Sequence, residues 1–148
     1  MIKKFITHSE AETFSLGKNF AEKIFPIQNN LTVLMFGDLG TGKTVFVRGV
    51  GEALGVKNVR SPSFTLINEY KTKYQNFLVH ADLYRLDENS VFSLGLEDYD
   101  NDFLFIEWSE RLTFPLSDNV LKIFFNAIDE NTRSIEFFSD NPEIIEKL

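Results

Sequence analysis

The stretch that decides the fold is Leu31–Thr44, LTVLMFGDLGTGKT. Its first six residues are nearly all apolar and too few for a buried helix, so they predict a fully buried strand. The next eight residues match the phosphate-loop pattern G-x-x-x-x-G-K-[ST] in full. A helical pattern then runs from Thr44 to Leu54, and Gly55 is well placed to end it. A glycine loop between a buried strand and a helix is the context that a nucleotide-triphosphate site requires.

The residue types in this loop are those that phosphate binding needs. Glycines let backbone N–H groups point inward at phosphate oxygens, and the helix that begins here presents the positive end of its dipole. Lys43 adds charge at the β and γ phosphates, and the Thr44 hydroxyl is a ligand for Mg²⁺. The loop residues expected to contact the nucleotide are Gly37, Asp38, Leu39, Gly40, Thr41, Gly42, Lys43, Thr44 and Val45.

Two later strand patterns end at an acid. NFLVHAD ends at Asp82, and DFLFIEW carries Glu107 behind four apolar residues. A P-loop protein needs a carboxylate at the end of a neighbouring strand to hold Mg²⁺ or to orient water. The apolar run favours Glu107 slightly, so we assign Glu107 to the metal and Asp82 to the water or γ-phosphate side. The reverse assignment stays open, and either acid alone is also compatible with a strand that simply closes at the surface.

Several other side chains are candidates on weaker patterns. Ser63 and Thr65 in SPSFT have the hydroxyls with which a switch loop senses a γ-phosphate, although a plain Ser-Pro turn explains the same letters better. Arg85 and Arg111 are candidates for stabilising transition-state charge, and surface salt bridges are the ordinary alternative. Trp108, the only tryptophan, follows an acid at a strand end, where core packing and a ligand or partner contact are equally compatible with the pattern.

Helix and strand patterns alternate through the rest of the chain. Residues 10–24 form an amphipathic helix pattern with Ser9 as a fair N-cap, residues 120–138 form a hairpin pattern, and residues 141–148 form a short terminal helix pattern. We therefore predict an α/β, P-loop NTPase-like three-layer fold with a largely parallel sheet and a C-terminal antiparallel hairpin. The length favours a single P-loop domain over residues 1–148.

Composition narrows the function classes. The net charge is −7, from 15 basic and 22 acidic side chains, which argues against unaided binding of nucleic acid. There is no cysteine, and His8 and His80 are too few for a histidine-rich metal site. No stretch approaches the roughly 18 continuous apolar residues of a membrane helix, and the N-terminus turns polar before an apolar signal region develops. A cytoplasmic protein is the expectation.

Four segments, GDLGTGKT, SPSFTLINEY, HADLYRL and FIEWSER, together resemble one bacterial family. It is the TsaE family, formerly YjeE, of ATPases in tRNA threonylcarbamoyladenosine synthesis. The similarity runs from about Glu10 to the strand around Arg133. The resemblance implies an ATPase that docks on the TsaB–TsaD pair, which attaches threonylcarbamoyl to the adenosine beside the anticodon, and that resets this pair between turnovers. It would meet tRNA only through that complex.

The resemblance also implies roles for residues that match the family's motifs. Gly37–Thr44 would hold the phosphates of ATP, and Thr44 with Glu107 would hold Mg²⁺. Asp82, within HADLYRL, would support hydrolysis. The expected catalytic set is therefore Lys43, Asp82 and Glu107.

The weaker matches to the family lie around this set. Ser61–Thr65 would act as the switch-like loop, Trp108 would lie beside the site, and Arg133 sits where the family has an arginine near the nucleotide. Two departures affect the site: Val45 replaces a second threonine, which removes a hydroxyl contact to the α-phosphate, and Ser63 replaces a threonine, which keeps the hydroxyl and drops a methyl. We expect these changes to shift nucleotide affinity without abolishing it.

Three functions compete on the sequence alone. The first is a slow ATPase that a partner complex stimulates, since no arginine is convincingly placed as a built-in finger. The second is a small-molecule kinase, which the short length and the lack of an arginine-rich lid disfavour. The third is a non-hydrolysing module that binds ATP as an assembly signal. No NKxD motif follows the last core strand, so GTP is not favoured.

Overall fold

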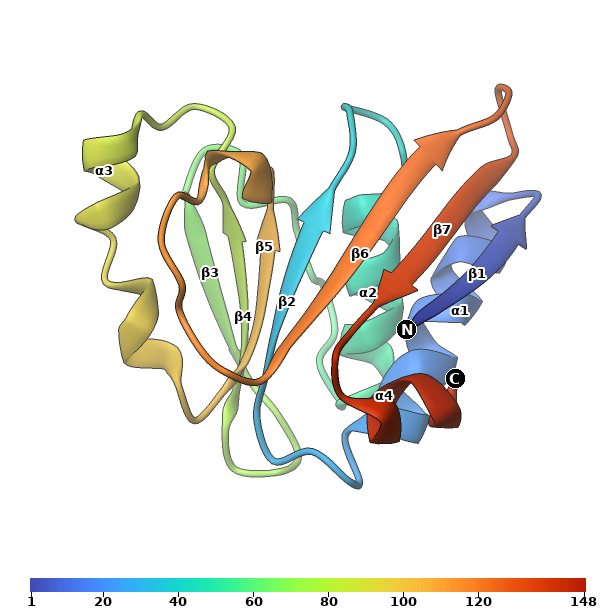
Figure 1. The fold of residues 1–148 in the computed structure, drawn as a ribbon, viewed down its shortest axis with the longest axis horizontal. Helices are drawn as coiled ribbons and strands as arrows, with labels where there is room; N and C mark the ends of the chain where they lie inside the picture. The colour runs from blue at the N-terminus through green and yellow to red at the C-terminus, as the bar shows by residue number, and fades with distance from the viewer.

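A single seven-stranded sheet organises the protein in the computed structural model, which describes all 148 residues (Figure 1). The strand order across the sheet is β1-β7-β6-β2-β5-β4-β3. The strands are β1 (Ile2–Thr7), β2 (Leu31–Phe36), β3 (Ile67–Lys71), β4 (Phe77–Asp82), β5 (Phe103–Glu107), β6 (Val120–Ala127) and β7 (Arg133–Phe138). The α-helices are α1 (Glu10–Ile24), α2 (Lys43–Ala53), α3 (Glu88–Phe92) and α4 (Pro142–Lys147), with 3₁₀ turns at Leu96–Tyr99 and Ser109–Arg111.

The centre of the sheet is parallel and its two sides are antiparallel. Strand β2 pairs in parallel with β5 and β6, and β4 pairs in parallel with β5. The hairpin of β6 and β7 is antiparallel, as are the pairs of β7 with β1 and of β4 with β3. The predicted α/β fold with a largely parallel sheet and a C-terminal antiparallel hairpin is confirmed, and the parallel pairs lie in the centre of the sheet. The parallel centre places the carboxyl ends of β2, β4 and β5 at one edge of the sheet.

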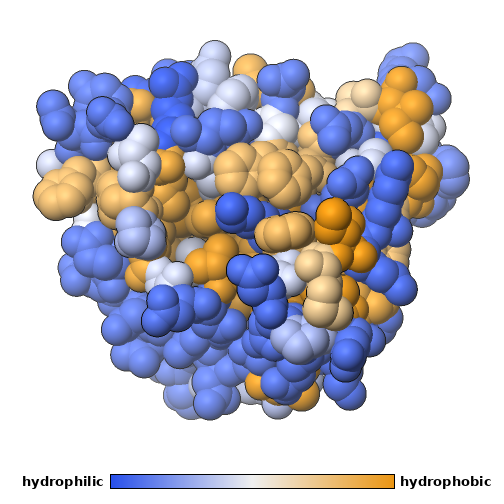
Figure 2. Space-filling view, in the orientation of Figure 1, coloured by the Kyte–Doolittle hydropathy of each residue, from blue (hydrophilic) through white to orange (hydrophobic).

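Two hydrophobic clusters cover the two faces of the sheet. The larger one joins α1, α2 and α4 to the sheet through side chains such as Phe20, Phe46 and Phe105, each at most 1% exposed. The smaller one packs α3, the first 3₁₀ turn and the segment after β5 on the opposite face, around Leu104 and Ile106. Figure 2 shows apolar side chains across the middle of the face in view, over the region where β2 and β6 lie in Figure 1.

Helices α1 and α2 touch through glycines. A Cβ at Gly17 would lie 2.1 Å from the carbonyl oxygen of Phe46, and a Cβ at Gly49 would lie 2.0 Å from that of Phe14. Real Cβ atoms do not approach so closely, so the two helices reach this spacing because both positions lack a side chain. The contact fixes α1 against the helix that begins at the phosphate loop.

Strand β1 was not predicted from the sequence. It is an edge strand, and its residues Ile2 to Lys4 are exposed. Its sequence, IKKFIT, lacks the alternation of apolar and polar residues by which strands are recognised. Its pairing with β7 alone forms it. None of the helices combines the length and the apolar character needed to cross a bilayer.

Candidate nucleotide-binding site

The phosphate loop connects β2 to α2, as predicted. Gly42 precedes the helix with a φ of 103°, a left-handed conformation that favours glycine, and no side chain caps the first turn of α2. The N–H groups of that turn are therefore free to bind an anion. The Lys43 ammonium donates a hydrogen bond to the carbonyl of Gly37 and lies 4.3 Å from the centre of the Trp108 ring.

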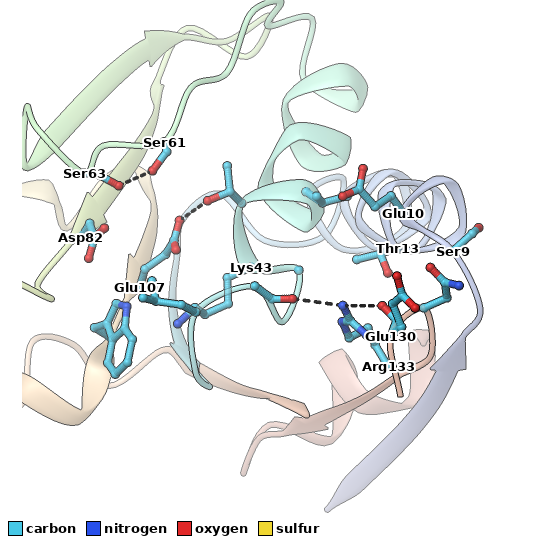
Figure 3. A pocket seen from close by; sticks show the side chains of 17 residues that line it. Ser9, Glu10, Thr13, Lys43, Ser61, Ser63, Asp82, Glu107, Glu130 and Arg133 are labelled. Atoms are coloured by element: carbon cyan, nitrogen blue, oxygen red, sulfur yellow. Dashed lines mark hydrogen bonds between the residues drawn. The ribbon is translucent and has the colours of Figure 1, made fainter. Parts of the chain in front are cut away.

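A cavity of about 360 Å³ opens beside this loop. Figure 3 shows Asp82, Glu107 and the serines of the loop before β3 on one side of Lys43, and α1 with Arg133 on the other. The predicted site residues that line the cavity are Leu39, Gly40, Gly42, Lys43, Thr44, Val45, Ser63, Asp82, Glu107, Trp108 and Arg133. Gly37, Asp38 and Thr41 do not line it. They build the base of the loop, where the Thr41 hydroxyl donates to the carbonyl of Asp38 over 2.8 Å.

The two strand-end acids lie side by side because their strands are adjacent. Asp82 of β4 and Glu107 of β5 are direct partners in the parallel register. The Thr44 hydroxyl donates to Oε2 of Glu107 over 2.8 Å, and Nε2 of His80 contacts the same oxygen at 2.5 Å. Asp82 makes neither contact, and its Oδ1 accepts from the backbone N–H of Tyr84.

The pKa values of Lys43, Asp82 and Glu107 are shifted in different directions by their surroundings. Burial lowers the pKa of the Lys43 ammonium in spite of the acids around it. Burial also raises the pKa of Asp82, and neighbouring Glu107 adds to that effect. For Glu107, burial acts in the same direction, but the hydrogen bonds from His80 and Thr44 and the nearby charges prevail and lower its pKa. Glu107 is therefore the acid that the protein itself keeps ionised.

The residues present fit a magnesium ion. Thr44 and Glu107 offer a hydroxyl and a carboxylate oxygen 2.8 Å apart, and both are the hard oxygen donors that Mg²⁺ prefers. No group of three or more His, Asp or Glu side chains forms a metal cage. This agrees with a Mg²⁺ site that takes one or two protein oxygens and fills its remaining positions with phosphate oxygens and water.

The far end of the cavity is built by Arg133, which the resemblance predicted, and by residues that the sequence patterns missed. Arg133 donates to the carbonyl of Gly40 over 3.1 Å and to three carbonyls of the turn between β6 and β7. The lining residues not predicted are Ser9, Glu10, Thr13, Glu130 and Asn131. Ser9 was recognised only as the N-cap of α1, a role it has through its bond to the N–H of Glu12. No local pattern marks these positions, because the sheet alone brings α1 and the β6–β7 turn together.

The loop before β3 faces the cavity on one side and solvent on the other. Ser61 and Ser63 line the cavity and contact each other at 2.6 Å, whereas the Thr65 hydroxyl turns away to Asn68. Phe64, between Ser63 and Thr65, is 86% exposed and faces solvent.

The two candidate arginines lie outside the cavity. The Arg85 guanidinium lies 5.1 Å from the centre of the Phe64 ring, and Arg111 follows Trp108 in the turn after β5. Neither lines the cavity. In this conformation Arg133 is the arginine that borders the site.

Known proteins match this chain over the residues that build the cavity. The family model of the threonylcarbamoyl adenosine biosynthesis protein TsaE matches residues 7–135, which include every side chain of the cavity wall. This chain belongs to the TsaE family. The predicted resemblance is confirmed.

Individual relatives cover nearly the whole chain. The tRNA threonylcarbamoyladenosine biosynthesis protein TsaE of Aquifex aeolicus is 36% identical over 144 residues, 93% of this chain and 97% of its own. The protein of the same name from a Nostoc species is 38% identical over 143 residues, 92% of this chain and 85% of its own. Among solved structures, Bacillus subtilis YdiB superposes with a TM-score of 0.79 at 27% identity, over 99% of this chain and 91% of that one.

Proposed function

We propose that this protein is a Mg²⁺-dependent ATPase of tRNA threonylcarbamoyladenosine biosynthesis, acting in the cytoplasm on a TsaB–TsaD-type complex. One observation carries the ATPase part: a single cavity is bounded by residues of the phosphate loop, by the Thr44–Glu107 pair and by Asp82. The pathway comes from the names of the relatives, since two TsaE proteins are more than a third identical to this chain over the aligned residues. The acidic chain supports contact with tRNA only through the partner complex.

In this proposal, each of the residues around Lys43 has one task. The loop N–H groups and Lys43 bind the phosphates, for which Lys43 must leave the carbonyl of Gly37. Thr44 and Glu107 would hold Mg²⁺, which would supply positive charge that neutralises the phosphates. Asp82 lies beside them with a pKa raised by burial, and this suits a group that orients a water molecule and accepts its proton.

The partner dependence is supported by where the arginines and Phe64 lie. A cation that stabilises transition-state charge raises phosphoryl-transfer rates by about 10³–10⁵. Arg133 has its donors engaged by carbonyls, and Arg85 and Arg111 lie outside the cavity. We therefore expect slow hydrolysis by the protein alone. Phe64, 86% exposed on the loop whose serines line the cavity, offers a partner a contact through which the occupied site is sensed.

The experiment is to measure ATP turnover with and without TsaB–TsaD, and the threonylcarbamoyladenosine content of tRNA in depleted cells. Wild type should be stimulated by the complex and should restore the nucleoside, whereas Lys43→Ala should do neither. The matched control is Arg111→Ala, which removes a charge outside the cavity and should behave as wild type. Equal turnover with and without the complex, or an unchanged nucleoside level after depletion, would contradict the proposal.

The same experiment separates the two alternatives. Stimulation of ADP release by added nucleosides or sugars would favour a small-molecule kinase. Restoration of the modified nucleoside by a Glu107→Ala variant that binds ATP without hydrolysing it would favour a non-hydrolysing module.

A further inference from the structure

His80 is a buried polar residue that the proposed chemistry does not use. It lies in β4, is 0% exposed, and stands two residues before Asp82. Leu78 and Phe105 belong to the cluster on the α2 side of the sheet, and the alternation of strand residues places His80 on that side as well. Glu107 lies diagonally across from it on β5, within reach of an imidazole.

The polar contacts of His80 go to a single partner. Its Nε2 contacts Oε2 of Glu107, and its Nδ1 is buried without a hydrogen-bond partner. An ionised carboxylate only accepts hydrogen bonds, so Nε2 must carry a proton to donate to it, and the contact leaves Nδ1 unsatisfied. A buried nitrogen without a partner destabilises the fold, and an apolar side chain of similar size would avoid this loss. The contact with Glu107 is therefore the reason for a histidine at this buried position.

The same carboxylate oxygen is the one that Thr44 contacts. Oε2 of Glu107 accepts from the imidazole on the β4 side and from the Thr44 hydroxyl on the α2 side. Two donors from different elements fix both the position and the rotation of the carboxylate. With Mg²⁺ and ATP bound, the Thr44 hydroxyl would be a metal ligand, and His80 would remain as the donor that orients the Glu107 carboxylate.

We propose that His80 is a positioning residue that holds the Glu107 carboxylate toward Thr44 and thereby presets the magnesium half-site. The inference rests on the proposed Mg²⁺–ATP function. It assigns His80 no contact with the nucleotide and no transfer of a proton. Loss of a residue that orients a metal ligand typically lowers metal affinity by about 10–100-fold.

A matched pair of amides tests this role. His80→Gln keeps an N–H donor near the position of Nε2, whereas the shorter amide of His80→Asn corresponds to Nδ1 and does not reach Glu107. His80→Leu fills the space without a donor. Trp108, the only tryptophan, lines the cavity, so its fluorescence reports binding of a non-hydrolysable ATP analogue during a Mg²⁺ titration.

We expect the Asn and Leu variants to require about 10–100-fold more Mg²⁺ for half-maximal response, with unchanged affinity for the analogue in the presence of EDTA. The Gln variant should stay close to wild type. Equal Mg²⁺ requirements in Asn, Leu and wild type, or equal loss in Gln and Asn, would overturn the role of His80. An equal loss of affinity for the analogue in EDTA would overturn it too, because His80 would then support the fold as a whole and not the magnesium site.

The wild-type response and one further measurement separate this inference from the proposed function. If wild type itself shows no Mg²⁺-dependent binding, the proposed function fails together with this inference, whereas a normal wild-type response separates the two. Nitrogen NMR of the wild-type imidazole needs no variant to fold. It should show a proton on Nε2, and a ring whose Nε2 carries no proton would refute the arrangement.

Discussion

Replacing Gly49 with alanine should loosen the packing on which the phosphate loop depends. The new methyl would lie 2.0 Å from the carbonyl oxygen of Phe14 and 2.9 Å from the backbone nitrogen of Lys18. Both atoms belong to the backbone of α1, so no side-chain rotation relieves the contact and the helices must separate by about 1 Å or more. Overpacking of this kind destabilises by about 1–3 kcal/mol, and we take the upper end because backbone must move.

Alanine also stabilises a helix interior by about 1 kcal/mol relative to glycine. The expected net loss is therefore about 2 kcal/mol, or about 4–8 °C in melting temperature for a domain of this size. Gly51→Ala in the same helix is the matched control. It has the same helix gain, and its methyl would meet the Val59 side chain at 2.6 Å, so its loss should be smaller.

Urea and thermal unfolding of the two variants would measure this difference. Helix α1 carries Ser9, Glu10 and Thr13 at the cavity wall, so Gly49→Ala should also weaken nucleotide binding while Gly51→Ala does so less. A Gly49→Ala protein as stable as Gly51→Ala would refute the argument that the two helix backbones are in contact at this position.

The two strand-end acids should affect stability with opposite signs. Because burial raises the pKa of Asp82, the stabilising contribution of this side chain is present below pH 3.8 and is lost as the pH rises. The Asp82→Asn variant should therefore be more stable than wild type at pH 7, and this advantage should disappear toward pH 3.8. Burial would also raise the pKa of Glu107, but hydrogen bonds and nearby charges lower it, so Glu107→Gln should be less stable than wild type at neutral pH. This deficit should shrink as the pH falls below 4.5. Urea unfolding at several pH values measures both effects, and a difference from wild type that does not change with pH would contradict the reasoning. Burial disfavours the charge of Lys43, so Lys43→Met should melt at or above the wild-type temperature while its affinity for ATP falls by about tenfold or more; a matching loss of stability would contradict this. Arg133→Ala should weaken binding of an ATP analogue by about tenfold in calorimetry, because it removes a cation at the cavity wall, whereas Arg111→Ala outside the cavity should match wild type.

The sequence allowed prediction of those parts of the site that lie within one continuous segment. The glycine loop, the strand before it and the helix after it follow from local patterns, and each is present. The hairpin of β6 and β7 and the helix α1 with its Ser9 cap were predictable for the same reason. Local propensity and burial periodicity suffice where an element's own residues decide its conformation.

Contacts between distant elements were not predictable in this way. The cavity wall formed by α1 and the β6–β7 turn depends on strand order, since β7 and β1 pair only at the end of the sheet. The contact of His80 with Glu107 depends on the register of β4 against β5, and a shift of one residue would turn the imidazole to the other face. A lone histidine in an apolar strand gives no sign of that partner.

Register also explains why two acids at equivalent strand ends acquire different properties. Asp82 and Glu107 are direct partners across β4 and β5, so simple position does not distinguish them. The longer glutamate reaches both the Thr44 hydroxyl and the imidazole of His80, and these donors overcome the effect of burial on its pKa. The shorter aspartate reaches only a backbone N–H, and burial prevails. One carboxylate is thus kept charged and its neighbour is made easier to protonate, which is the division that the proposed metal ligand and the proposed proton acceptor require.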